Sequence, residues 1–189
     1  MDWSFDTLKR LSRCEACPRR CGADRANGER GLCGAALDAA VARAAPHHWE
    51  EPCVSGKNGS GAVFFCGCAL RCVFCQNSDI SNGTAGAELS LESLCETLYR
   101  LAKSGVHNIN LVTPTQYSFQ IRDALECLRL DLPVIFNCGG YERVETLKAL
   151  RGLVDVYMPD FKFPSREYSE KLCERGDYAD AAIPALFEM

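Results

Sequence analysis

Three closely spaced cysteines are the residues of this 189-residue chain that are best suited to chemistry. Cys68, Cys72 and Cys75 form a C-x3-C-x2-C run that follows a short apolar stretch, 62–65. Thiolates this close along a loop can hold a small iron–sulfur cluster, but a four-iron cluster ordinarily takes four cysteines. One iron would then keep an open coordination position, which a catalytic metal site needs and a structural site does not. An amino-acid-derived cofactor could chelate that iron through its amino and carboxylate groups.

A second group of cysteines lies near the start of the chain. It consists of Cys14, Cys17, Cys21 and Cys33, with glycines between them that allow the tight turns of a four-thiolate cage. The stretch has too few apolar residues to build a core of its own, so we expect a metal to order it. Four thiolates suit zinc and an iron–sulfur cluster alike, and a cysteine-rich loop without metal is a third possibility.

The composition limits the setting of this chemistry. Thirteen cysteines, an odd number, without a signal for export at the start of the chain indicate thiols kept reduced rather than a disulfide framework, so a cytoplasmic location is expected. No apolar run approaches the ~20 residues that span a bilayer, so no membrane partner is expected. The net charge of −4 argues against a nucleic-acid partner held by bulk positive charge.

Strands and helices are predicted to alternate along most of the chain. The apolar patterns predict strands at 62–65, 109–113, 133–136 and 153–158, and helices at about 90–104, 121–128 and 144–150. This is the pattern of an α/β fold with parallel strands, either a (βα) barrel or a doubly wound sheet. Four units do not close a barrel of eight, and the last residues, 185–189, resemble part of a further helix. We therefore expect a C-terminally truncated chain with a Cys-rich segment over 1–52 and an incomplete barrel over 53–189.

The C-x3-C-x-aromatic-C run after the first predicted strand resembles the signature of the radical S-adenosylmethionine (SAM) superfamily. Together with segments 59–65, 76–77, 110–115 and 155–162, it makes most of the chain similar to proteins described as pyruvate formate-lyase activating enzymes. The resemblance implies a partial parallel (βα) barrel. It also implies a [4Fe-4S] cluster on Cys68, Cys72 and Cys75, with SAM chelating the fourth iron.

The resemblance further implies a reaction and its partners. An electron from the cluster would cleave SAM into methionine and a 5′-deoxyadenosyl radical, which takes a hydrogen atom from a substrate. A flavodoxin or ferredoxin is the electron donor that the resemblance suggests. The substrate would be a glycyl radical enzyme, or a different protein or small molecule.

Polar residues after the predicted strands are the candidate SAM contacts. In the resembling enzymes, polar residues at such positions contact SAM. The alternative for Asp160 and Lys162 is that they are only loop-capping charges. A Gly-Gly-Glu element that often binds the SAM amino group in the wider superfamily is replaced here by Val112-Thr113-Pro114, so this contact is left unassigned. The candidates are Thr113, Asn137, Asp160 and Lys162, with Thr115 beside the first of them.

A function of another class also fits the cysteines. A non-catalytic iron–sulfur or zinc protein for electron transfer or assembly would use the same loop, with Cys66 or Cys53 as the fourth ligand. Among the other cysteines, Cys95 and Cys127 are predicted to be small buried apolar residues on helix faces. Cys138, at the end of a predicted strand, lies either near the cofactor or in an ordinary loop. The stretch 47–52, with two histidines, a tryptophan, two glutamates and a proline, is predicted to be an ordinary surface or packing element rather than part of the active site.

Overall fold

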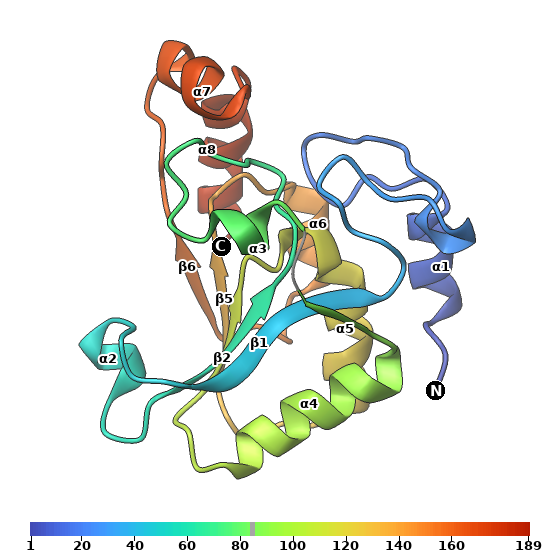
Figure 1. Cartoon of the computed structure of the whole chain (residues 1–189), viewed down its shortest axis with the longest axis vertical. Coiled ribbons are helices and arrows are strands. Elements are labelled where there is room, and N and C mark those ends of the chain that lie inside the picture. Colours follow the sequence, from blue (N-terminus) through green and yellow to red (C-terminus); the bar gives the residue numbers. More distant parts are fainter. Residues whose placement is uncertain (84–85) are drawn as a thin grey trace.

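A six-stranded sheet forms the centre of the computed structural model, which describes residues 1–83 and 86–189 (Figure 1). The strands follow the order β3-β1-β2-β4-β5-β6 across the sheet. They are β1 (Ala39–His47), β2 (Ser60–Phe65), β3 (Ala87–Leu89), β4 (Ile109–Val112), β5 (Val134–Cys138) and β6 (Val156–Pro159).

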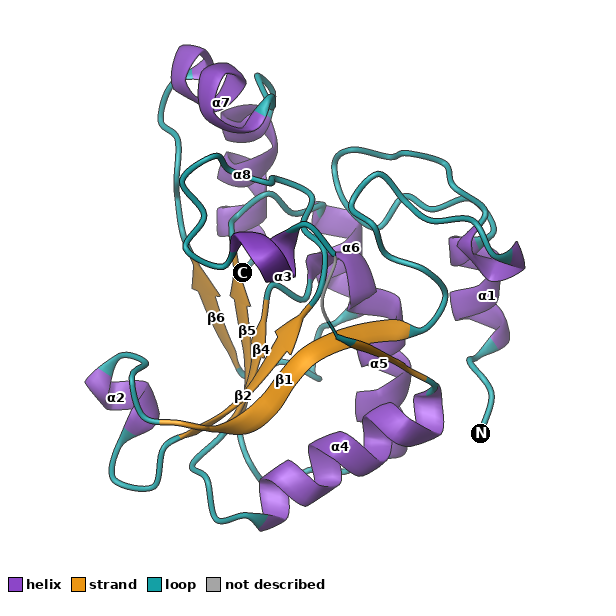
Figure 2. Cartoon of the chain, viewed as in Figure 1, coloured by secondary structure: helices purple, strands orange, loops and turns teal. Residues whose placement is uncertain are grey.

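Strands β2, β4, β5 and β6 are parallel, as the alternating sequence pattern predicted. Figure 2 shows their arrowheads pointing to the same end of the sheet. In register, Phe64 lies beside Val112, Val112 beside Asn137, and Asn137 beside Met158. One row of side chains therefore crosses all four strands near their carboxyl ends, the edge at which open α/β sheets bind ligands.

Three helices connect these parallel strands. They are α4 (Leu91–Lys103), α5 (Ser118–Cys127) and α6 (Val144–Ala149). The first of them begins where the sequence predicts, since the Ser90 hydroxyl accepts a hydrogen bond from the Ser93 amide. It packs on the sheet through Leu94 and Leu98, both fully buried, and Gly105 follows its end with φ +89°.

Strands β1 and β3 extend the sheet and were not predicted. β1 pairs antiparallel with both β2 and β3. Five of its nine residues are alanine, which has little preference for strands, and it contains a proline, so its sequence gives only a weak strand signal. β1 lies within the segment 1–52 and is hydrogen-bonded to β2 of the segment 53–189; the division of the chain at residue 52 stays a prediction.

The remaining helices lie outside the sheet. Figure 1 shows the last two helices of the chain, α7 (Arg166–Cys173) and α8 (Tyr178–Glu188), beyond the carboxyl ends of the parallel strands. The helix expected at the end of the chain is present, and within the described part of the chain no helix is long and apolar enough to cross a membrane. These helices are α1 (Phe5–Leu11), α2 (Pro52–Ser55), α3 (Ser78–Ser81), α7 (Arg166–Cys173) and α8 (Tyr178–Glu188), with short 3-10 helices η1 (Arg25–Asn27) and η2 (Thr115–Tyr117).

Candidate active site

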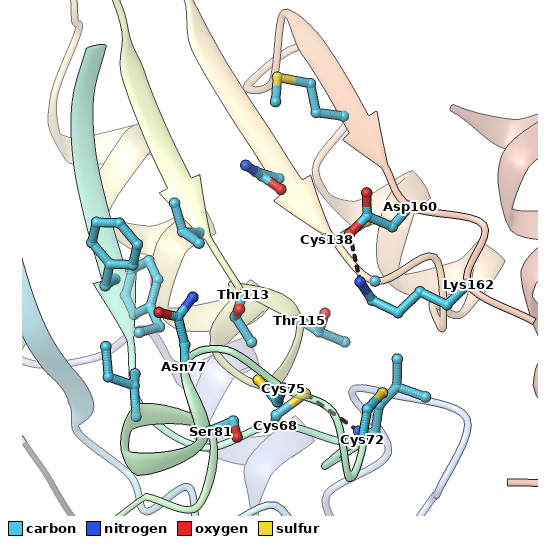
Figure 3. Close-up of a pocket in the computed structure, with 18 of the residues that line it drawn as sticks. Cys68, Cys72, Cys75, Asn77, Ser81, Thr113, Thr115, Cys138, Asp160 and Lys162 are labelled. Atoms are coloured by element: carbon cyan, nitrogen blue, oxygen red, sulfur yellow. Dashed lines mark hydrogen bonds and ion pairs between the residues drawn. The ribbon is translucent and has the colours of Figure 1, made fainter. Parts of the chain in front are cut away.

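A cavity of about 890 Å³ opens at the carboxyl ends of the parallel strands. Its size suits a ligand larger than a simple metabolite. All of the cysteines of the C-x3-C-x2-C loop and all of the candidate SAM contacts line it (Figure 3). These residues are Cys68, Cys72, Cys75, Thr113, Thr115, Asn137, Asp160 and Lys162.

The three-cysteine loop lies between β2 and α3. The Leu70 amide donates a hydrogen bond to the Cys68 sulfur at 3.4 Å, so the backbone already wraps around that atom. Burial raises the pKa of Cys68, and burial together with the neighbouring Cys173 and Cys68 thiols raises the pKa of Cys72 to about 12. Thiols in such surroundings stay protonated unless a cation compensates the thiolate charge, and a bound metal does this.

The loop is fixed to the strand end by Gln116 of η2. The side-chain amide nitrogen of this buried residue donates to the carbonyl oxygens of Cys66, Gly67 and Thr113, at 2.9 to 3.0 Å. Two of these carbonyls directly precede Cys68 and the third belongs to the end of β4. Gln116 therefore sets the position of the cysteine loop against the next strand, a role that the sequence analysis missed because nothing in the local pattern marks it.

Thr113 adopts a strained backbone conformation at the end of β4. Its φ of +57° lies in the left-handed region, which a β-branched side chain rarely occupies. The surroundings hold it there, because its amide donates to the Asn137 carbonyl and its own carbonyl accepts from Gln116. Strain of this kind is concentrated at functional sites, and here it accompanies a hydroxyl at the wall of the cavity.

Asp160 and Lys162 form an ion pair with each other at the wall of the cavity (Figure 3). They follow β6, and a single buried side chain from α8 fixes this turn. The Tyr178 hydroxyl bonds to the carbonyl oxygens of Gly139 and Asp160 and accepts from the Lys162 amide, each at 2.8 Å. Because Tyr178 is fully buried, it fixes the ends of β5 and β6 to one another.

Glu142 is the cavity residue that the sequence analysis did not identify. Its side chain is fully buried, Thr115 donates a hydrogen bond to Oε1, and the Cys138 thiol lies against the same carboxyl group. Within the described part of the chain, Oε2 has no hydrogen-bond partner. Burial raises the pKa of Glu142 to about 8. The only sequence signal was an acidic residue two positions after the Gly-Gly turn that ends β5.

The charge on the cavity wall is predominantly negative. Glu50, Glu51 and Asp160 contribute carboxylates to it, and Glu142 adds a fourth carboxyl group that stays protonated at neutral pH without a ligand, whereas Lys162 supplies the one amine among the described lining residues. His47 and Trp49 also contribute to the wall, so most of the stretch predicted to be surface lies at this cavity. A wall of this charge favours a cationic ligand.

The four N-terminal cysteines are also gathered together in the structure. Cys14, Cys17 and Cys33 are buried and Cys21 is half-buried, and the electrostatic influence of Cys14, Cys17 and Cys21 reaches Cys33. In residues 1–83 and 86–189, no three histidine, cysteine or acidic side chains are grouped so that they could hold a single metal ion.

The other cysteines follow the predictions in part. Cys95 is buried, as expected, but Cys127 is exposed and its predicted burial is wrong, because α5 ends at this residue. Cys138 is buried and lines the cavity. The Cys173 thiol lies beside Cys72 of the three-cysteine loop, whereas Cys53 is exposed on α2.

Comparison with known proteins identifies the family. The pattern of the Radical SAM superfamily matches residues 62–187, which include most of β2, the three-cysteine loop and all of β4, β5 and β6. The chain belongs to the radical SAM superfamily. An uncharacterized protein of Methanocaldococcus jannaschii is 34% identical to it over 189 residues, which cover 95% of this chain and 54% of that protein. The radical SAM chain thus spans about half the length of this relative, and no solved structure matches it significantly.

Membership of this superfamily implies a [4Fe-4S] cluster and SAM as cofactors, and the residues present fit them. Three thiols reach the cavity from one loop, which matches the number that leaves one iron of a four-iron cluster open. The negative wall and the unpartnered Oε2 of Glu142 suit the ammonium and sulfonium charges of SAM.

Proposed function

We propose that this radical SAM protein reductively cleaves SAM and uses the resulting radical to take a hydrogen atom from a substrate. The observation that supports this most directly is the presence of three thiols and a negatively charged wall in one cavity. When bound, the cluster supplies the electron and SAM supplies the 5′-deoxyadenosyl radical. The protein provides orientation, electrostatic complementarity and exclusion of water.

Cys68, Cys72 and Cys75 would hold the cluster. The Leu70 amide already points at the Cys68 sulfur, and such a hydrogen bond stabilises a metal-bound thiolate. Gln116 keeps the start of the loop at a fixed distance from Thr113, so the cluster and the strand end keep one relative position.

Glu142 and the Asp160–Lys162 pair would orient SAM from the strands opposite the loop. In the absence of a ligand, the Glu142 carboxyl keeps its proton at neutral pH because it is buried. An ammonium group of the ligand would pair with the carboxylate and so stabilise the ionised form that burial disfavours. The hydrogen bond from Thr115 fixes the direction of the carboxyl group. The chain lacks a Gly-Gly-Glu element at 112–114, and Glu142 offers a carboxyl group from the turn after β5 in its place. Thr113 and Asn137 add a hydroxyl and an amide at the same edge of the sheet.

We also propose that the substrate is a glycyl radical enzyme and that flavodoxin or ferredoxin supplies the electron. What supports this finer proposal is the resemblance of segments 110–115 and 155–162 to activating enzymes. The test is to mix the reconstituted protein, SAM and reduced flavodoxin with a glycyl radical enzyme and to record its radical by electron paramagnetic resonance (EPR). A glycyl signal that depends on SAM supports the assignment, and SAM cleavage without that signal contradicts it.

The general proposal is tested by product analysis. The anaerobically reconstituted protein, reduced with dithionite, should convert SAM into methionine and 5′-deoxyadenosine. Replacement of any loop cysteine, Cys68→Ala, Cys72→Ala or Cys75→Ala, should abolish both products, whereas Cys95→Ala removes a buried thiol outside the cavity and should retain them. Equal turnover in a loop variant and in wild type would show that the ligand assignment is wrong.

A further inference from the structure

The four N-terminal cysteines have no part in the proposed reaction, yet the structure brings their thiols close enough to influence one another. Backbone hydrogen bonds close the first loop, from the Cys14 amide to Ala23 and from the Gly22 amide to Cys14, each at 3.0 Å. On the other side, a Cβ atom at Gly31 would lie 3.3 Å from the Cys33 sulfur and 3.5 Å from the Cys21 sulfur. Only a glycine leaves the space between these two sulfur atoms open.

A fully buried cation lies at the same place. Arg25 of η1 donates hydrogen bonds from its guanidinium group to the carbonyl oxygens of Ala36 and Gln116, and to the Cys14 sulfur at 3.5 Å. No carboxylate in residues 1–83 or 86–189 forms an ion pair with it. A buried guanidinium without a counter-charge is costly, so negative charge on the neighbouring sulfur atoms would stabilise it.

We infer that Cys14, Cys17, Cys21 and Cys33 hold a second iron–sulfur cluster whose negative charge is balanced by Arg25. Four thiolates can hold a two-iron or a four-iron cluster, and each thiolate in a four-iron cluster binds a different iron. A cluster therefore suits sulfur atoms that surround a space, whereas zinc at about 2.3 Å from each sulfur needs them grouped around one point.

The second site lies directly against the first. A Cβ atom at Gly67, next to Cys68, would lie 2.4 Å from the backbone oxygen of Cys33. The Gln116 residue whose carbonyl accepts from Arg25 also holds the Gly67 carbonyl through its side chain. The two cysteine groups are thus connected by backbone contact and by hydrogen bonds, and a second cluster here could pass an electron toward the cavity.

Metal analysis of the full chain tests the inference without relying on activity. After anaerobic reconstitution, wild type should contain about six or eight iron atoms per chain, with equal sulfide, rather than four. The double variant Cys21→Ala and Cys33→Ala leaves only two of the four thiols, too few to hold a cluster, and should reduce the count to about four. The control Cys127→Ala removes an exposed thiol outside both groups and should leave the count unchanged. Four iron atoms in wild type, or one zinc in place of the extra iron, would overturn the inference.

The inference and the proposed function can fail separately. The triple variant Cys68→Ala, Cys72→Ala and Cys75→Ala should lose all SAM cleavage but retain two or four iron atoms. If it retains them while wild type does not cleave SAM, the proposed function fails and the second cluster stands. A triple variant that folds, as judged by circular dichroism, but binds no iron overturns the inference.

The role of Arg25 has its own readout in the triple variant, where only the second cluster contributes. Loss of a cation beside a cluster favours its oxidised form, so Arg25→Gln should make the reduction potential more negative. Arg25→Lys, which keeps the charge, should restore most of the wild-type value. Equal potentials in all three proteins would show that Arg25 does not balance the cluster charge.

Discussion

Thr115 donates a hydrogen bond to Glu142 inside the cavity, and this bond directs the only fully buried carboxyl among the described lining residues. The two residues come from η2 and from the turn after β5. Their contact thus joins neighbouring strand ends, and it leaves Oε2 of Glu142 without a hydrogen-bond partner in the described chain. The carboxyl group is held in place for a ligand that brings positive charge.

The raised pKa of Glu142 predicts a pH-dependent stability of the protein without its ligands. The folded state keeps a proton on this carboxyl up to a pH of about 8, whereas the unfolded state loses it at the ordinary carboxyl pKa near 4.5. The stabilising contribution is therefore complete below about pH 4.5 and is lost as pH rises to 8. Glu142→Gln should remove this fall between pH 5 and 8 in urea unfolding. If the free energy of unfolding changed with pH in the same way in the variant and in wild type, a raised pKa of Glu142 would be contradicted.

The Thr113 backbone predicts an unusual order of stabilities. Thr113→Gly relieves the left-handed strain and Thr113→Ala does not, although both remove the hydroxyl. The glycine variant should be the more stable of the two by about 1 kcal/mol, measured by urea unfolding. A more stable alanine variant would mean that no strain is stored at this position. Both should bind SAM more weakly than wild type.

Removal of the Tyr178 hydroxyl is expected to lower the stability of the protein. Tyr178→Phe leaves the Lys162 amide without its partner and releases the carbonyls of Gly139 and Asp160. The free energy of unfolding should fall by about 1–3 kcal/mol. Tyr168→Phe on α7 is the matched control, since this tyrosine is 57% exposed, and it should change stability by less than about 0.5 kcal/mol. Equal effects of the two changes would refute the role of the buried hydroxyl.

Asp160 and Lys162 are expected to contribute to the affinity for SAM. Each should contribute a charged hydrogen bond, so Asp160→Asn or Lys162→Met should weaken SAM binding by roughly tenfold to a hundredfold in isothermal titration. Lys171→Met, an exposed lysine of α7 outside the cavity, is the control and should leave the affinity unchanged. If both cavity variants bound SAM with wild-type affinity, the alternative that these two residues only cap the loop would be supported.

The sequence predicted the parallel half of the sheet because those strands are continuously apolar and the helices between them have regular apolar spacing. It did not predict β1, whose alanines carry little strand preference and whose pairing with β2 is a long-range contact. The cysteine loop was readily identified, since its ligands lie within eight residues. Glu142 and Gln116 were not, because their importance comes from burial and from partners on other strands.

EPR at low temperature tests the central claim most directly. The protein is reconstituted anaerobically, reduced with dithionite and measured with and without SAM, in wild type and in Cys72→Ala. The account predicts a reduced-cluster signal in wild type whose shape changes when SAM is added, and no such response in the variant. A wild-type spectrum that SAM leaves unchanged, at a SAM concentration that saturates binding, would contradict an open iron in this cavity.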